Sequence, residues 1–535
     1  MQAKQVQYKN TGQLAIKITV GIDPSAVSIL KTITGCKRHS KGYWTCLLSY
    51  KNAQILLDNG FGLCDKISAY LSNKPTELKI PKVKIKGLQG TLRKYQQEGV
   101  AFIEMMNGRA LIADDMGLGK TIQAIAYLQL HPETRPALII VPGCVKYKWE
   151  REIIKWIPNP GKIQILSGQT PSKRIHGDIV IVNYDIIYYW RMLLYKAGFK
   201  IMIADEIQYF KNNSAKRTNV IKRIGKKTKK LIGLSGTPIE NRPMELFNFV
   251  NMCDAKLFPN AFSFGMTYCA GYHNGYDWVF SGASNLPQLN TILRKHIMIR
   301  RLKKDVLKEL PNINYSVIPV LLDNKKDYDI AKSQFIKFVK ESRGSKSSGT
   351  DTRGETLAQL TALKKMVGVG KIPSIIEWVD DFLLTGEKLV ISGWHKDVLK
   401  VLYAHYKKIA ILIDGSVSNK DVLAERFQKE NSLKLAIVNM KAGGVGIDLF
   451  AAASILVVEY HWTPTMLDQV IARIHRMGQK RKVNAYYMIG LDTIENKLIS
   501  MLDKKKNIIS QAMDGKQVEG NILINDLIDF MLNEK

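Results

Sequence analysis

Two short segments contain residue types that could bind and hydrolyse a nucleoside triphosphate. The first, "DDMGLGKTIQAIAYL", follows an apolar run and contains Gly117, Gly119, Lys120 and Thr121. Glycines allow a tight turn that presents backbone amides to phosphate, a lysine can reach the outer phosphates, and a threonine hydroxyl can bind Mg²⁺. The strict phosphate-loop pattern is broken, because Asp114 stands at the position of its first glycine. By itself the segment leaves a phosphate loop and an ordinary turn equally open.

The second segment, "MIADEIQYFKN" (202–212), places Asp205 and Glu206 directly after the apolar run "IMIA". A phosphate loop needs a carboxylate at a neighbouring strand end to hold Mg²⁺ and a base to orient the attacking water. An isolated Asp-Glu pair is more often two charges where a buried strand meets solvent. Because the glycine-lysine-threonine segment lies upstream, the catalytic interpretation is favoured.

These residues need strands to position them. Apolar runs of four or five residues alternate with helical stretches in "RALIADD", "PALIIVP", "DIVIVNY", "KIMIADE" and "KLIGLSG", and the pattern returns in "KLVISGW", "IAILIDG", "LKLAIVNM" and "SILVVEY". Short apolar runs of this kind are typical of a parallel sheet covered on both faces. The sequence therefore predicts an α/β protein with two doubly wound parallel-sheet domains in tandem.

Changes in residue pattern along the chain indicate its division into domains. Alternating apolar positions in "QLAIKITV", followed by helix-like "NAQILLDNGFGLCDKISAYL", indicate a small α+β unit at the N-terminus. The predicted domains are an accessory domain (1–80), a first lobe with a helical insertion (81–310), an inter-lobe helical linker (311–370) with a mobile loop (341–355), a second lobe (371–500) and C-terminal helices (501–535).

The charge indicates a polyanionic partner. Lys and Arg total 79 and Asp and Glu 47, so the formal net charge is 79 − 47 = +32. A surplus of this size in a globular chain favours nucleic acid, and a basic surface selected only for solubility is the alternative. The N-terminus lacks the apolar core of a signal peptide, no window approaches a membrane span, and the six cysteines form no C-x-x-C. We expect an intracellular, DNA-associated monomer without a membrane partner or a cysteine-based metal site.

Taken together, "DDMGLGKT", "ADEIQYFKN" and "GLSGTPIENRPMELF" resemble motifs I, II and III of the SWI/SNF-type branch of superfamily-two helicase-like ATPases. Other blocks are similar to further motifs in the family's order: "LRKYQQEGVAFI" (the adenine-reading glutamine motif), "IIVPGCVKYKWEREI" (Ia), "DIVIVNYD" (Ib), "AGGVGIDLFAAASILVVEYHWTP" (V) and "DQVIARIHRMGQKRKV" (VI). The resemblance runs from about Leu88 to about residue 500. It implies two RecA-like lobes, ATP and Mg²⁺ as cofactors and DNA as partner.

The resemblance also implies roles for single residues. The ATP-binding residues would be Gln96, which reads adenine, and the phosphate-holding Gly117, Gly119, Lys120 and Thr121. The catalytic residues would be Lys120, the metal-side Asp205, the base Glu206 and the arginine fingers Arg473 and Arg476. The Mg²⁺ ligands would be Thr121 and Asp205. By spacing alone, two arginines three apart would be a solvated helix face.

Coupling between ATP and DNA would use motif III and its neighbours. The implied coupling residues are Gln208, Ser235 and Thr237, and the candidate DNA contacts are Lys211, Asn212, Lys441 and Trp462. In motif II, Gln208 stands where many relatives carry histidine. In motif V, Asn439 and Met440 stand where hydroxyl residues are usual, and Asp448 stands where asparagine is usual. The departures in motif V leave open a DNA-binding scaffold with a weak ATPase.

Three further sequence blocks indicate which subfamily of the SWI/SNF-type branch the chain resembles. "MIRRLKKDVLKELP" resembles the basic segment that SWI/SNF-type proteins carry between the lobes, and "KIPSIIEWVDDFLLTGEKLVISGWHKDVLKVL" is similar to the annealing-helicase subfamily. "GCKRHSKGYWTCLLSYKNAQILL" is faintly similar to that subfamily's HARP module, and a generic α+β DNA-binding module is an equal alternative. The resemblance implies an ATP-dependent translocase on double-stranded or branched DNA that anneals strands or remodels forks. A remodeller that displaces proteins from DNA is the main alternative.

Overall fold

The computed structural model describes residues 2–7, 14–20, 23–33, 36–40, 42–47, 50–72, 80–81, 83–171, 174–344, 351–417, 419–443, 446–496, 498 and 513–514. The described chain forms two compact units that divide between Arg301 and Leu302, and the short segment Asp115–Leu118 groups with the second unit. We call residues 83–301 lobe 1, residues 302–498 lobe 2 and residues 2–72 the N-terminal domain. Each is described by itself.

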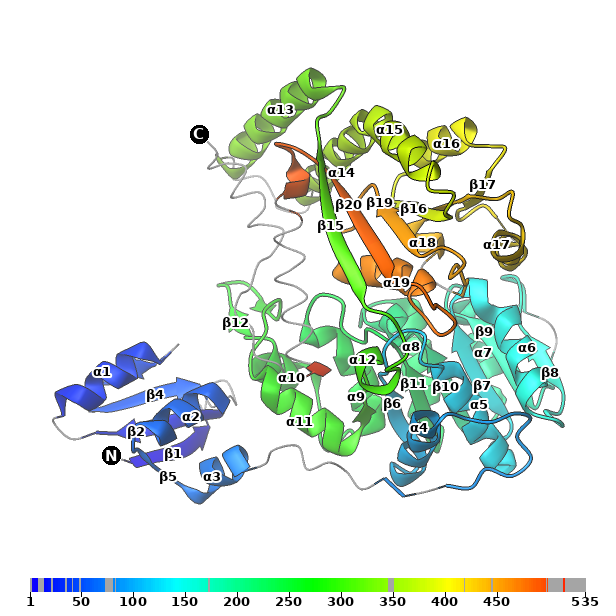
Figure 1. Ribbon diagram of the computed structural model, residues 1–535. Coiled ribbons are helices and arrows are strands. Elements are labelled where there is room, and N and C mark those ends of the chain that lie inside the picture. The colour runs from blue at the N-terminus through cyan, green and yellow to red at the C-terminus, as the bar shows by residue number, and fades with distance from the viewer. Residues whose placement is uncertain are drawn as a thin grey trace. The chain divides into compact units, whose positions relative to one another are not determined.

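The N-terminal domain is a five-stranded sheet with three helices (Figure 1). The strand order is β3-β4-β2-β1-β5, from β1 (Gln2–Gln7), β2 (Leu14–Thr19), β3 (Lys37–Arg38), β4 (Tyr43–Leu47) and β5 (Gly62–Leu63). The helices are α1 (Pro24–Thr32), α2 (Tyr50–Asp58) and α3 (Asp65–Ser72). Asp23 caps α1 by accepting hydrogen bonds from the backbone amides of Ser25 and Ala26. The N-terminal domain is therefore an α+β unit, as the alternating and helical patterns of its sequence predicted.

Lobe 1 is built on a parallel seven-stranded sheet in the order β14-β6-β11-β10-β7-β9-β8. Every residue of β7 and β9 is buried, because helices cover both faces of the sheet (Figure 1). The strands are β6 (Arg109–Ile112), β7 (Ala137–Val141), β8 (Ile163–Ile165), β9 (Ile179–Asn183), β10 (Ile201–Asp205), β11 (Lys230–Leu234) and β14 (Met298–Ile299), with a separate hairpin of β12 (Tyr272–His273) and β13 (Trp278–Val279). The α-helices are α4 (Lys94–Met105), α5 (Lys120–Leu130), α6 (Lys146–Trp156), α7 (Ile187–Lys196), α8 (Lys216–Gly225), α9 (Phe247–Cys253), α10 (Ala261–Tyr268) and α11 (Leu286–His296).

Lobe 2 contains a second parallel sheet, of six strands in the order β15-β20-β19-β16-β18-β17. The strands are β15 (Ile313–Val320), β16 (Leu389–Gly393), β17 (Ala410–Ile413), β18 (Leu435–Asn439), β19 (Ser454–Val457) and β20 (Val483–Gly490). The helices are α12 (Lys303–Val306), α13 (Lys325–Gly344), α14 (Asp351–Gly370), α15 (Ile372–Leu383), α16 (Lys396–His405), α17 (Lys420–Lys429), α18 (Met440–Gly443) and α19 (Pro464–Ile474). The predicted fold class, two parallel-sheet domains in tandem with a small N-terminal α+β domain, is confirmed.

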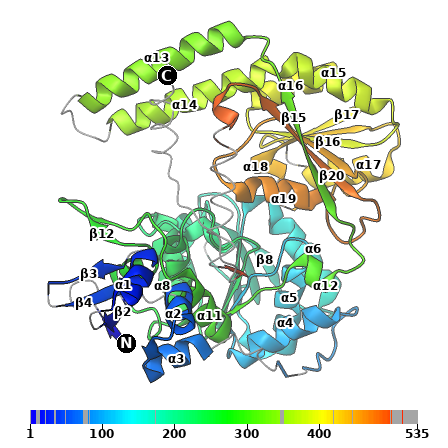
Figure 2. The same ribbon diagram turned by 60° about the vertical axis from the view of Figure 1, so that its left-hand side comes forward.

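The segment predicted as a helical linker differs from that expectation. Residues 313–320 form β15, which pairs with β20 along its whole length. The strand lies at the sheet edge, where Pro319 can stand because its missing amide has no partner to lose. Helices α13 and α14 then lie side by side (Figure 2). They include residues 341–344 and 351–355 of the predicted loop, and residues 345–350 lie outside the described residues.

The strand order of lobe 1 explains how distant motifs meet. β11 lies between β6 and β10, so the segments after these three strands leave the same edge of the sheet. In an open parallel sheet this carboxyl edge is where ligands bind. In the part of the chain that the structure describes, no helix has the length and apolar character to cross a membrane.

Candidate nucleotide site

The glycine-rich loop after β6 has the backbone of a phosphate cradle. Gly117 and Gly119 have φ values of 87° and 77°, a region that side chains disfavour. A Cβ atom at Gly119 would lie 2.5 Å from Nε2 of Gln96, so a larger residue there would require the Gln96 side chain to move. Helix α5 starts at Lys120, and its first amides point toward the loop, as in anion-binding helix N-termini. Nζ of Lys120 donates to the carbonyl oxygen of Asp114 at 3.0 Å.

Gln96, the expected adenine reader, lies against this loop. Its side chain is buried on α4, and its Oε1 accepts a hydrogen bond from the backbone amide of Arg93 at 2.9 Å. The same side chain is the nearest neighbour of Gly119. The structure therefore brings the glutamine motif and the phosphate loop together.

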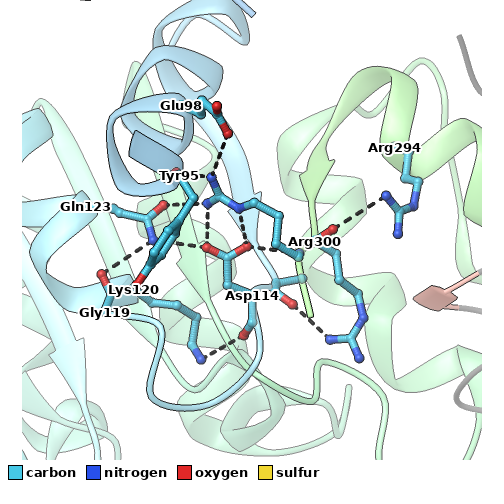
Figure 3. A network of polar contacts seen from close by, with 10 residues as sticks. Tyr95, Glu98, Asp114, Gly119, Lys120, Gln123, Arg294 and Arg300 are labelled. Atoms are coloured by element: carbon cyan, nitrogen blue, oxygen red, sulfur yellow. Dashed lines mark hydrogen bonds and ion pairs between the residues drawn. The ribbon is translucent and has the colours of Figure 1, made fainter. Parts of the chain in front are cut away.

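Asp114, which replaces the first glycine of the strict pattern, is fully buried and paired with an arginine from the end of lobe 1. Nε and Nη2 of Arg301 donate to its two carboxylate oxygens at 2.9 and 2.5 Å, and Nε2 of Gln123 donates to it at 3.0 Å. Another nitrogen of the same guanidinium donates to the carbonyl of Tyr95. Figure 3 shows Tyr95, Gln123 and Asp114 converging from three elements. The residue that breaks the motif thus anchors the loop to α4, to α5 and to the segment that leads into lobe 2.

Asp205 and Glu206 stand at the end of β10, as predicted. Oδ2 of Asp205 accepts a hydrogen bond from Nε1 of Trp149 at 2.8 Å, and its backbone carbonyl accepts one from the Tyr184 hydroxyl at 2.7 Å. Burial and the neighbouring charge of Glu206 raise the pKa of Asp205 to about 7, against the Trp149 hydrogen bond and the positive charge of Lys120. Glu206 has a φ of 57°, a strained backbone for a residue with a side chain. The pair is held in a defined position rather than left at a solvated strand end.

A hydrogen-bond relay connects motif II to motif III. Nε2 of Gln208 donates to the Glu206 carboxylate at 2.8 Å, and the Ser235 hydroxyl donates to Oε1 of Gln208 at 2.8 Å. The backbone amide of Thr237 then donates to the Ser235 oxygen at 3.1 Å. A glutamine amide both donates and accepts, so it fills this place without a titrating group. The three residues expected to couple the site form one chain.

Lys211, one of the candidate DNA contacts, has acidic partners within lobe 1. Its ammonium is paired with the carboxylates of Glu240 and Glu245, the latter at 3.3 Å. Although burial opposes it, the charges of these two carboxylates raise the pKa of Lys211. The adjacent Asn212 is exposed and accepts a hydrogen bond from the Ser214 amide. Lys211 thus connects motif II to motif III, and its role as a DNA contact stays a prediction.

In lobe 2, Arg476 has a partner that explains the departure in motif V. Its guanidinium donates to the carboxylate of Asp448, and burial lowers the pKa of Arg476. Arg473 lies in the last turn of α19, where its backbone carbonyl accepts from the Leu449 amide at 3.0 Å. The extra carboxylate at residue 448 therefore orients one of the two expected arginine fingers.

The two candidate DNA contacts of lobe 2 differ in exposure. Lys441 is exposed on α18, directly after β18. Trp462 is half-buried, and Nζ of Lys364 lies 4.4 Å from its ring centroid. Both remain candidates.

The residues at the carboxyl edge of lobe 1 fit ATP and Mg²⁺. A Cβ atom at Gly119 would press on the Gln96 side chain, and Lys120 is close enough to Asp205 to act on its pKa. Among the described residues the Thr237 hydroxyl is buried without a hydrogen-bond partner, which suits a site completed by a ligand. Mg²⁺ in nucleotide sites takes one or two protein ligands together with phosphate and water. Thr121 and Asp205 would supply that number.

Sequence reasoning missed several residues of this site. Trp149 and Tyr184 hold Asp205, and Arg301 holds Asp114. Trp149 lies within the Ia block and Arg301 within the basic block "MIRRLKKDVLKELP". Both blocks were recognised, but no signal in them indicates the carboxylate that each side chain reaches.

The fold and this edge define a class. A parallel sheet with a glycine-lysine-threonine loop after β6 and an Asp-Glu pair at the end of β10, the next strand but one, is the core of a RecA-like nucleoside triphosphatase. Residues 95–372, more than half of the chain, match the family model of the SNF2-related domain, and residues 374–478 match that of the helicase conserved C-terminal domain. The chain belongs to the SNF2-related family of helicase-like ATPases.

Several known proteins are similar to the chain over about four fifths of its length. The DNA annealing helicase and endonuclease ZRANB3 of Bos taurus is 32% identical over 451 residues, which are 80% of this chain and 41% of that protein. The SWI/SNF-related matrix-associated actin-dependent regulator of chromatin subfamily A-like protein 1 of Xenopus laevis is 31% identical over 433 residues, 79% of this chain and 44% of that protein. The chain thus spans about two fifths of the length of these relatives. A solved Sulfolobus solfataricus SWI2/SNF2 ATPase core in complex with dsDNA is 24% identical, with a TM-score of 0.41, over 81% of this chain and 96% of that one.

Proposed function

We propose that the chain is an ATP- and Mg²⁺-dependent motor that translocates on double-stranded or branched DNA and serves strand annealing or fork remodelling. The observation that carries the proposal is the convergence of Lys120, Asp205 and Glu206 at one edge of the lobe 1 sheet. Net charge supports DNA as the track, because +32 favours a polyanion. Relatives named as annealing helicases, at 31% to 32% identity, support the kind of work.

In this proposal each residue has one task. The loop amides and Lys120 hold the phosphates, Thr121 and Asp205 hold Mg²⁺, and the metal offsets the negative charge of the phosphates. Glu206 accepts a proton from the attacking water, and Gln208 keeps the Glu206 carboxylate oriented through its 2.8 Å hydrogen bond. Ser235 transmits the state of Glu206 to the turn at Thr237. Arg473 and Arg476 are assigned as arginine fingers on their resemblance to motif VI alone.

The test is ATP turnover measured without DNA and with single strands, blunt duplex, forks and bubbles. We expect turnover to rise with DNA, and most with forks or bubbles. Glu206→Gln should keep ATP and DNA binding while turnover falls by about two orders of magnitude or more, because only the base is lost. Glu355→Gln, an exposed carboxylate on α14, is the matched control and should behave as wild type.

Two results would contradict the proposal. If none of the DNA substrates raised ATP turnover in the wild type, the chain would not be a DNA motor. If Glu206→Gln hydrolysed ATP at nearly the wild-type rate, Glu206 would not be the base. Strand annealing is separated from protein displacement by assaying both on the same forked substrate.

A further inference from the structure

The sheet of the N-terminal domain has one covered face and one open face. Side chains that alternate along its strands, Ala3, Ile16, Ile18, Trp44 and Cys46, are buried in one core. That core also contains residues from all three helices: Ala26, Leu30, Ala53, Leu56 and Ile67. Successive side chains of a strand point to opposite faces. The helices therefore pack on one side of the sheet, and the intervening strand residues lie on the other.

That other side carries lysines directly opposite one another. In the register of the sheet, Lys4 on β1 faces Lys17 on β2, and Lys17 faces Thr45 on β4. Lys4 is exposed and Lys17 is half-exposed. Like charges directly opposite each other destabilise a sheet. The domain thus carries an arrangement that costs it stability, which indicates that this face meets a negatively charged partner.

Two aromatic rings lie beside the lysines. The rings of His39 and Tyr43 are stacked, with centroids 4.7 Å apart and an interplanar angle of 17°. Nζ of Lys17 lies 4.3 Å from the Tyr43 centroid, and His39 is bound to the Thr45 hydroxyl at 2.7 Å. Both rings are partly exposed. We define Lys4, Lys17, His39 and Tyr43 as the open face.

The charge of the domain is distributed unevenly. Residues 1–80 contain eleven Lys and Arg and four Asp and Glu, a net charge of 11 − 4 = +7. Of the acids, Asp23 caps α1, Asp58 ends α2 and Asp65 starts α3. Every acidic residue in the described part of the domain thus lies at a helix end, and the strands carry only basic charge. The open face is complementary to a polyanion.

We propose that the open face binds a single strand of DNA, with phosphates on Lys4 and Lys17 and a base against the His39–Tyr43 pair. Lysines that face no carboxylate across the sheet can bind phosphates, and the aromatic rings beside them can stack on bases. An unpaired strand is favoured over duplex because stacking on a protein ring needs a base that is free of its pair. The inference rests on the proposed DNA substrate and adds to it a second binding site, outside the ATPase lobes, for the unpaired part of a fork or bubble.

The test compares two charge reversals in the full-length protein. Lys4→Glu changes the open face, and Lys66→Glu makes the same change of charge at an exposed position of α3, the helix side of the same domain. Lys4→Glu is chosen because the new carboxylate would face Lys17, an opposite-charge pair that favours the sheet. We therefore expect the variant to stay folded, and its melting temperature checks that a loss of binding does not come from unfolding.

Affinity is measured by fluorescence anisotropy with a labelled single-stranded oligonucleotide over a series of salt concentrations. We expect Lys4→Glu to bind more weakly and the slope of log affinity against log salt to fall by roughly 0.7 for each phosphate that the variant no longer binds. Lys66→Glu should keep the wild-type slope. Blunt duplex, measured in parallel, should lose less affinity than the single strand.

The inference would be overturned by equal losses of affinity in both variants, by an unchanged salt slope in Lys4→Glu, or by equal losses for duplex and single strand. Displacement of the single strand by an acidic peptide at equal charge concentration would also overturn it, since the partner would then be a protein. Failure of the proposed function is observed separately, as wild-type ATP turnover that none of the DNA substrates raises. The two proposals can therefore fail independently.

Discussion

Replacing Arg301 with leucine should destabilise lobe 1 and weaken ATP binding, because Asp114 would lose its buried partner. The Arg301 side chain donates two hydrogen bonds to Asp114, one to Gln123 and one to the Tyr95 carbonyl. Its removal leaves a fully buried carboxylate with Gln123 and the amide of residue 301 as its remaining donors. The positive charge that balanced it is gone.

The loss of stability in Arg301→Leu can be estimated from the hydrogen-bond donors that Asp114 keeps. Removing one member of a buried ion pair costs about 3 to 5 kcal/mol. Two donors to Asp114 survive, so we expect the lower end, about 3 kcal/mol. For a unit of roughly 200 residues each kcal/mol shifts the melting temperature by about 2 to 4 °C, so Arg301→Leu should melt about 6 to 12 °C below the wild type. Asp114→Leu with Arg301→Leu leaves no unpaired charge and should recover much of the loss.

The assays are thermal unfolding and ATP turnover against ATP concentration. Because the Arg301–Asp114 pair joins the phosphate loop to α4 and α5, the KM for ATP should rise more than kcat falls, and the double variant should not restore KM. If Arg301→Leu changed stability by less than about 1 kcal/mol, the pair would not anchor the loop. Additive losses in the double variant would show that Asp114 and Arg301 act separately.

Two further predictions concern buried polar contacts. Trp149→Phe removes the hydrogen bond to Asp205 but keeps an aromatic ring, so the Mg²⁺ concentration for half-maximal turnover should rise about 10-fold or more. The melting temperature should also fall, because Trp149 is buried and the smaller ring leaves a cavity. An unchanged Mg²⁺ requirement would refute the role of Trp149. Burial lowers the pKa of Lys364 to about 8. As the pH rises, the folded state therefore loses this proton before the unfolded state does. The free energy of unfolding should rise between pH 8 and about 10.5, by up to roughly 3 kcal/mol. Lys364→Met should flatten this rise in urea unfolding, and Lys365→Met, at the half-exposed neighbour, should not.

Much of this architecture was predictable because its signals are local. A run such as "ALIIV" is buried on both faces and cannot tolerate charge, so it marks a parallel strand wherever it occurs. The expected strands of both lobes therefore appeared in the expected order. Residues 313–320 were missed because "INYSVIPV" mixes polar and apolar residues, as an edge strand does, and its pairing with β20 is made about 170 residues away.

The amino-acid sequence alone determined which residues could handle a nucleotide, because glycine, lysine, threonine and carboxylate chemistry depends on residue type and on short spacing along one strand end. Only the tertiary structure decided which partner each residue has. Asp114 pairs with a guanidinium 187 positions away, Asp205 with an indole 56 positions away, and Lys211 with the carboxylates of Glu240 and Glu245. The physical reason is that a buried polar group must find its partner across the fold, and the order of strands in a sheet, not spacing along the chain, determines which groups come within reach.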